Sequence, residues 1–118
     1  MELPGRGRRV GKPVAGEVVV IPFPQTDLAR GKRRPALVLA DLPGDDLILC
    51  QITSRQRLDG FSIPLDSSDF ERGQLHQQSF IRSQRLFTVE GTVILYSVGK
   101  VHASKLSEAL EKARNLFN

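Results

Sequence analysis

The sequence predicts a mainly β domain, a small closed barrel of six to seven short strands with one helix at its C-terminal end. Short runs of β-branched and other apolar residues recur between turn-forming residues along most of the chain. Only the last segment has the period of an amphipathic helix. The 118 residues are enough to bury one hydrophobic core and too few for two ordinary domains. We therefore expect a single barrel domain.

The first three strands follow from apolar runs that end at turn formers. Residues 18–21 (VVVI) are ended by Pro22, which restricts this run to a sheet edge or a strand end. Residues 35–42 are closed by the turn-forming sequence at 43–46, and residues 47–52 then alternate along the chain. The runs at 35–42 and 47–52 are therefore predicted to pair as a hairpin of buried strands.

The later elements are shorter. Residues 61–65 alternate as a strand, and the capping-box pattern from Ser68 to Glu71 predicts one short helical turn before Gly73. Residues 79–82, 86–89 and 92–98 read as further strands, the last two joined by a tight turn at Glu90 and Gly91.

The C-terminal segment has a helical pattern, with Ser104 as the expected N-cap. Its apolar side chains recur at three- and four-residue spacings, so this helix is expected to lie on the barrel. They are Leu106, Ala109, Leu110, Ala113 and Leu116.

Residues 1–15 are rich in Arg, Gly and Pro, a composition that predicts a mobile basic arm burying nothing, ahead of a single domain at 16–118. This segment has no apolar stretch before a cleavage site, so a cytoplasmic protein is expected. No run approaches the roughly 20 apolar residues of a membrane-spanning helix. The single cysteine, Cys50, lies in an apolar run and is interpreted as a core residue.

The formal net charge of +4 favours an anionic partner, with nucleic acid as the default. Four cations cluster before the second strand, and Arg suits phosphate because its planar fork donates two hydrogen bonds and stays charged. The alternative is a solvated basic loop. The cluster consists of Arg30, Lys32, Arg33 and Arg34.

Thr53 and Ser54 end a predicted buried strand, where hydroxyl groups are held firmly beside a ligand. The alternative is that they cap a turn. The two histidines, His76 and His102, are far apart and lack the spacing of a metal site, so neither metal nor another cofactor is expected.

Four short motifs occur in an order that resembles the MazF/PemK/Kid toxins of bacterial toxin–antitoxin pairs. They are residues 16–23 (GEVVVIPF), 32–39 (KRRPALVL), 51–54 (QITS) and 79–82 (SFIR). The resemblance covers the chain from Gly16 to its end. It implies an SH3-like, plasmid-maintenance-toxin barrel with a C-terminal helix, a homodimer, and cleavage of single-stranded RNA within short sequences.

The resemblance also implies residue roles. Arg34 and Thr53 match the positions that act on the RNA phosphate, with Ser54 beside them. The ribose 2′-hydroxyl attacks the adjacent phosphate to give a 2′,3′-cyclic phosphate and a 5′-hydroxyl without metal. RNA thus supplies its own nucleophile, and the enzyme must align it and stabilise the added charge. A cognate antitoxin with an extended acidic segment is the implied partner besides mRNA.

The general base is open at this stage. Glu17 is one candidate, because these toxins commonly carry an acid there, but it is equally an anchor of the barrel. Some toxins have Arg and Asp where Gln77 and Ser79 stand here, and His76 is a substitute proton carrier or plain surface. Arg82 matches an Arg that many members keep, and it either holds a loop or touches RNA.

Two alternatives belong to other functional classes. One is a member of the same fold that has lost nuclease activity and binds nucleic acid or a protein partner. The other is an unrelated SH3-like or ribosome-associated module that contacts RNA passively. The fold alone does not choose between them.

Overall fold

A computed structural model of the protein describes residues 11–22, 32–56 and 58–118. It has seven strands and one α-helix, with two 3₁₀ turns at Ser67–Asp69 and Gly91–Val93. The elements are β1 (Glu17–Pro22), β2 (Arg33–Asp41), β3 (Asp46–Thr53), β4 (Ser62–Leu65), β5 (Phe70–Gly73), β6 (Ser79–Glu90), β7 (Tyr96–Val101) and α1 (Ala103–Asn115).

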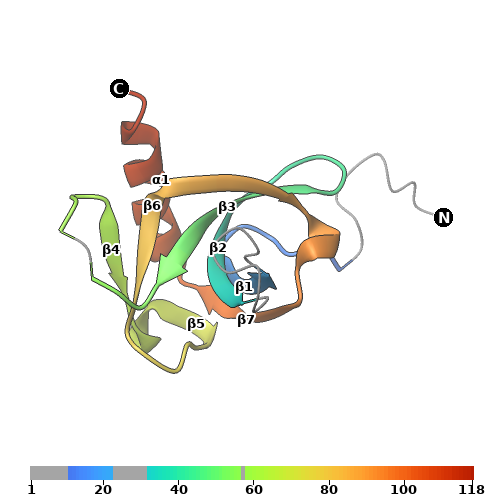
Figure 1. The fold of residues 1–118 in the computed structure, drawn as a ribbon, viewed down its shortest axis with the longest axis horizontal. Helices are drawn as coiled ribbons and strands as arrows, with labels where there is room; N and C mark the ends of the chain where they lie inside the picture. The colour runs from blue at the N-terminus through green and yellow to red at the C-terminus, as the bar shows by residue number, and fades with distance from the viewer. Residues whose placement is uncertain (1–10, 23–31, 57) are drawn as a thin grey trace.

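The strands form one antiparallel sheet in the order β4-β6-β3-β2-β1-β7-β5, which curls into a half-barrel with α1 beside β6 (Figure 1). The predicted fold class, mainly β with a C-terminal helix, is confirmed. The order begins and ends with four-residue strands, β4 and β5, so the described sheet is curled without being fully closed.

The pairing of β2 with β3 confirms the predicted hairpin, with Ala36 opposite Gln51. The hairpin predicted around Glu90 and Gly91 is wrong. Residues 79–90 form one continuous strand that pairs with β3 and β4, whereas β7 pairs with β1 and β5. The buried Gly91 donates to the carbonyl of Asp45, and the 3₁₀ turn that begins there carries the chain away to the other side of the sheet.

Two predicted caps lie a few residues from the observed ones. The capping box joins Asp66 and Asp69 rather than Ser68 and Glu71, because the Asp66 carboxylate accepts from the Ser68 N–H at 3.0 Å. The 3₁₀ turn that it caps is followed by strand β5. Helix α1 begins at Ala103 with His102 as its N-cap, so Ser104 lies inside the first turn.

The sheet has an apolar core on each face. The larger core lies under α1, which buries Ala109 and Ala113 in it, and it includes Leu37, Ile52 and Ile81. Cys50 is fully buried there and burial raises the pKa of its thiol to about 12, which confirms the predicted core role. The second core, on the opposite face, consists of Val19, Ile21, Ala36, Val38, Leu47 and Leu49.

The segment before β1 differs from the expected arm. Lys12 is 1% exposed, and its ammonium group reaches the carboxylate of Asp41 at 2.8 Å and the carbonyls of Leu42 at 2.6 Å and Gly44 at 2.8 Å. A buried lysine requires such partners for its three donors, which the β2–β3 turn provides. Residues 11–15 are therefore part of the domain, while 1–10 lie outside the described residues. None of the described helices is long and apolar enough to cross a membrane.

Candidate functional site

Polar side chains extend the second core at the open end of the β2–β3 hairpin. Gln51 on β3 pairs with Ala36 on β2 and with Arg82 on β6, and Arg34 pairs with Ile21 on β1. Because side chains alternate along a strand, residues two apart share a face. The side chains on the face of the second core therefore include Arg34, Gln51, Thr53 and Arg82. We call these four residues the polar row.

Arg34 is half-buried, and its Nε lies below the surface with no hydrogen-bond partner among the described residues. An N–H donor held in this way costs free energy unless something accepts from it. The side chain begins on a strand whose next residues, Pro35 to Leu37, are paired with β1, so the backbone fixes the position of its Cα.

Thr53, also half-buried, ends β3. Its hydroxyl oxygen accepts from the N–H of Arg55 at 3.1 Å, an interaction that turns the chain and fixes the side chain. The expectation that this hydroxyl caps a turn is therefore correct, yet the hydroxyl hydrogen stays available to donate.

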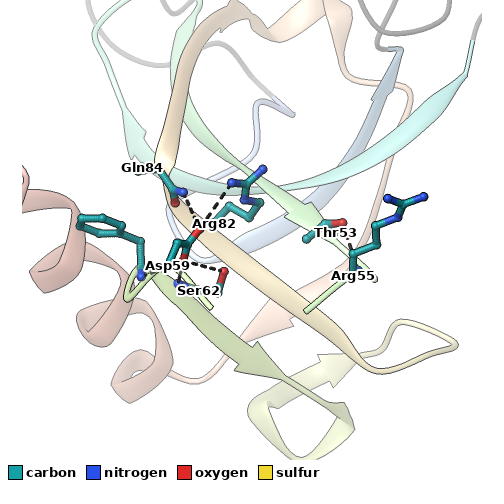
Figure 2. Close-up of polar contacts among 7 residues, drawn as sticks. Thr53, Arg55, Asp59, Ser62, Arg82 and Gln84 are labelled. Atoms are coloured by element: carbon teal, nitrogen blue, oxygen red, sulfur yellow. Dashed lines mark hydrogen bonds and ion pairs between the residues drawn. The ribbon is translucent and has the colours of Figure 1, made fainter. Parts of the chain in front are cut away.

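Arg82 belongs to a network that joins β6 to the loop before β4 (Figure 2). The Asp59 carboxylate accepts from Gln84 Nε2 at 2.9 Å and from Arg82 Nη2 at 3.5 Å. Figure 2 shows Asp59 lying between Ser62 and the pair Arg82 and Gln84, with Thr53 on the neighbouring strand.

The Asp59 carboxylate is anchored from its own loop as well. It accepts from the N–H groups of Phe61 at 3.0 Å and Ser62 at 3.2 Å, and from the Ser62 hydroxyl at 3.3 Å. These hydrogen bonds, the one from Phe61 first, lower the pKa of Asp59 to about 2. A carboxylate with so low a pKa stays ionised and is a poor proton acceptor at neutral pH.

The region holds a concentration of unsatisfied polar atoms. Buried atoms without a hydrogen-bond partner among the described residues include Arg34 Nε and Arg82 Nε, together with Gln51 Oε1 and Gln84 Oε1. Such atoms are rare in folded proteins and gather where a ligand, ion or water completes the bonding. Two arginines and a hydroxyl on one rigid face suit an anion, and a phosphate above all.

The sequence model of the PemK-like, MazF-like toxins of type II toxin–antitoxin systems matches residues 15–117. The chain belongs to this family. No relative among curated proteins matches at a significant level.

Solved structures of MazF toxins have a similar fold. MazF of Deinococcus radiodurans is 25% identical, with 89% of this chain and 96% of that chain covered and a TM-score of 0.68. MazF in a MazE–MazF crystal from the same organism is 23% identical, with 91% of this chain and 96% of that chain covered and a TM-score of 0.67. The Mycobacterium tuberculosis toxin MazF-mt6 is 20% identical, with 86% and 95% covered and a TM-score of 0.66.

Glu17 is not brought to the polar row of this MazF-like toxin. Its carboxylate accepts from the Val14 N–H at 2.8 Å and from the Ser97 hydroxyl at 2.9 Å. Glu17 lies four residues before Ile21, which pairs with Arg34 across the sheet. At roughly 3.3 Å per strand residue, Glu17 and Ile21 are about 13 Å apart. The contacts support the anchoring alternative for Glu17.

The remaining sequence-predicted residues fall in three places. His76 and Gln77 are exposed in the loop before β6, and the Gln77 carbonyl accepts from the Ser79 hydroxyl at 3.1 Å. Ser79 is 4% exposed and alternates with Ile81 toward the larger core, so the structure takes it away from the polar row. Three further residues, Lys32, Arg33 and Ser54, are exposed beside the row, while Arg30 lies outside the described residues.

Three site residues were not singled out from the sequence. Gln51 was assigned to an alternating strand and to the QITS motif, in which only Thr53 and Ser54 were chosen as site residues. Asp59 precedes Gly60, a pair that signals a turn, but its contact with Arg82 spans 23 residues and has no local signature. Gln84 falls in the irregular stretch of β6 where the register with β3 shifts. Among the described residues, no group of three or more His, Cys, Asp or Glu side chains is placed to hold a metal ion.

Proposed function

We propose that the protein is a sequence-selective, metal-independent endoribonuclease that cleaves single-stranded RNA, chiefly mRNA, to 2′,3′-cyclic phosphate and 5′-hydroxyl ends. The family assignment supports the toxin part of this proposal. The polar row supports the nuclease part of the proposal. Its donors come from Arg34, Thr53 and Arg82 on one face of the sheet, and two of the guanidinium N–H groups have no partner among the described residues.

In the proposed reaction the 2′-hydroxyl oxygen attacks the adjacent phosphorus, and the bond from phosphorus to the 5′-oxygen of the next nucleotide breaks. The 2′-hydroxyl loses its proton and the departing 5′-oxygen gains one. Arg34 and the Thr53 hydroxyl donate to the phosphoryl oxygens, whose negative charge grows in the transition state. Donors fixed before the reaction stabilise that charge without reorganisation.

Most of the rate enhancement is assigned to in-line alignment and charge stabilisation. Glu17 is engaged by Val14 and Ser97, and Asp59 has a pKa of about 2. We therefore assign neither carboxylate as the general base. Arg82, also in the polar row, is a second cation for the RNA backbone, and Lys32 and Arg33 extend the positive surface from the start of β2.

A cognate antitoxin is the proposed protein partner. One solved relative is an endoribonuclease in complex with its cognate antitoxin, and another was crystallised as MazE–MazF. An extended acidic segment would cover the basic surface around Arg33 and Arg34 by charge complementarity. We further propose that the toxin is a homodimer that acts in the cytoplasm.

A second candidate function rests on a specific observation. Gln77 and Ser79 stand where some toxins carry Arg and Asp, and Ser79 is buried on the core side. A member of the family that binds RNA or a protein without cutting RNA would have such a site. It would show salt-sensitive binding and leave the RNA intact.

The deciding experiment is incubation of the purified protein with a long single-stranded RNA in EDTA, followed by mapping of the fragment ends. We expect discrete cuts with 5′-hydroxyl and cyclic phosphate ends. Arg34→Ala should abolish them, whereas Arg114→Ala, on the exposed side of α1, should not. RNA that stays intact would replace the nuclease proposal with the binding one, and cuts that persist in Arg34→Ala would identify a contaminant.

A further inference from the structure

We propose that Asp59 is a positioning residue of this site, which holds Arg82 at the phosphate-binding face through a carboxylate fixed by its own loop. The inference deepens the proposed function and rests on it. It concerns a residue outside all four motifs of the sequence, on the loop between β3 and β4.

The two oxygens of Asp59 have separate tasks. Oδ1 accepts from the Phe61 and Ser62 N–H groups and from the Ser62 hydroxyl, all within three residues along the chain. Oδ2 accepts from Arg82 and Gln84 on β6, 23 and 25 residues away. One oxygen thus fixes the carboxylate to its loop, and the other acts on the distant strand.

The contacts of Oδ2 are unequal. The bond from Gln84 Nε2 is 2.9 Å long, well inside the ordinary range, whereas the Arg82 Nη2 contact at 3.5 Å is at its limit. Gln84 therefore helps to keep Asp59 in place, and the long contact from Nη2 lets Asp59 attract Arg82 while its Nε stays unpaired among the described residues. A phosphate oxygen at the usual charge-assisted distance of about 2.8 Å would compete successfully for the same guanidinium.

Burial makes this attraction effective. The Arg82 side chain is 14% exposed and that of Asp59 is 30% exposed, so water screens the pair only partly. Arg82 and its neighbour Gln84 lie beside the bulge at which β6 changes register with β3. The side chains there need an additional constraint, and the ionised Asp59 supplies one.

A carboxylate that only stabilised its loop would act independently of Arg82. A carboxylate that positions Arg82 would lose its effect once Arg82 is absent. The two roles are therefore separated by a double-mutant cycle, which measures the coupling between two residues. Asp59→Asn is the suitable change, because it removes the charge and keeps the size and one acceptor oxygen.

The experiment compares wild type, Asp59→Asn, Arg82→Ala and the double variant. It measures cleavage of a single-stranded RNA and binding of the same RNA made uncleavable by 2′-deoxy substitution. We expect Asp59→Asn to weaken binding and slow cleavage roughly tenfold in the presence of Arg82, and to have less than about a twofold effect in its absence. Equal losses in both backgrounds would overturn the proposal.

Ser62→Ala provides the matched control, because it removes one bond to Oδ1 and leaves Oδ2 unchanged. It should lower the melting temperature slightly without altering the coupling. A third readout is the NMR resonance of the Arg82 Nε–H group, which Asp59→Asn should shift more than that of Arg34. An unshifted resonance in the folded variant would contradict positioning.

The readouts also separate this inference from the proposed function. If the wild-type protein binds RNA without cutting it, the nuclease proposal fails while the coupling in binding still decides the role of Asp59. If it cuts RNA and the coupling is absent, the nuclease stands and Asp59 is a loop residue.

Discussion

A buried or half-buried cation lies at each end of the β2–β3 hairpin. The two cations differ in whether their hydrogen-bond donors have partners in the protein. At the turn, Lys12 is fully covered and its ammonium group has a carboxylate and two carbonyls within 2.8 Å. At the open end, Arg34 is half-buried and its Nε has no acceptor among the described residues. Lys12 reaches the turn from the segment before β1, whereas Arg34 belongs to β2 itself.

The difference shows how to separate structural from functional charge in a small domain. A cation whose donors are all used by the protein contributes to folding, because its removal would leave acceptors unpaired. A cation fixed in place with donors unused contributes little to folding and is ready for a ligand. On this criterion the turn end is structural, and the open end has the features of a ligand-binding site.

Replacement of Arg34 should have the largest effect on activity. Arg34→Ala is expected to reduce RNA cleavage about 100-fold to 1000-fold, since it removes a donor to the developing charge. The melting temperature should stay within a few degrees of wild type, because no described contact is lost. Single-turnover cleavage and thermal unfolding measure the two quantities, and a large loss of stability would place Arg34 with Lys12.

Replacement of Lys12 should give the reverse result. Lys12→Met leaves Asp41 and two carbonyls without their buried partner, which is expected to cost roughly 3 kcal/mol in free energy of unfolding. Cleavage per folded molecule should not change. Urea unfolding checks the first statement, and an activity loss in fully folded Lys12→Met protein would break the comparison.

A smaller effect is expected for the hydroxyl of Thr53. Thr53→Val keeps the shape and removes the donor, so cleavage should fall roughly 10-fold to 100-fold, the value of one hydrogen bond to a charged group. Thr53→Ser restores the hydroxyl and should retain most of the activity. Equal activity in Val and Ser variants would show that Thr53 only turns the chain toward Arg55.

Glu17 should show the smallest change in activity. Glu17→Gln weakens the bonds from Val14 and Ser97, and we expect about 1 kcal/mol less stability with cleavage within roughly twofold of wild type. The pH dependence of cleavage should be unchanged. A variant that folds normally and cleaves far more slowly would restore Glu17 as a candidate base.

Much of the fold was predictable because it depends on local signals. The β2–β3 hairpin follows from two alternating runs around a turn, and α1 follows from its period. The pairing of β6 was not predictable, since Glu90 and Gly91 form a turn either way and only the rest of the sheet decides which strands meet. Lys12 was misjudged for a related reason, because its three partners lie 29 to 32 residues away.

The candidate site shows the same difference between residues with a local sequence signal and residues that meet only in the folded sheet. Arg34 and Thr53 were singled out through motifs, and the structure brings them to one face. Asp59 and Gln84 meet Arg82 only through the folded sheet, so no spacing in the sequence reveals them. Ser79 was chosen only from its alignment with the family motif. It lies two residues from the buried Ile81, so its side chain is on the face of the larger core and not on that of the polar row.

The Lys12 contact has a practical consequence for handling the protein. It fixes the start of the domain at the β2–β3 turn, and the eight residues of β3 separate that turn from Thr53 by about 25 Å. A dye, affinity tag or surface linker joined at Gly11 would therefore be attached far from the polar row. Gly11 is therefore a suitable point for immobilising the protein when the polar row is to stay accessible.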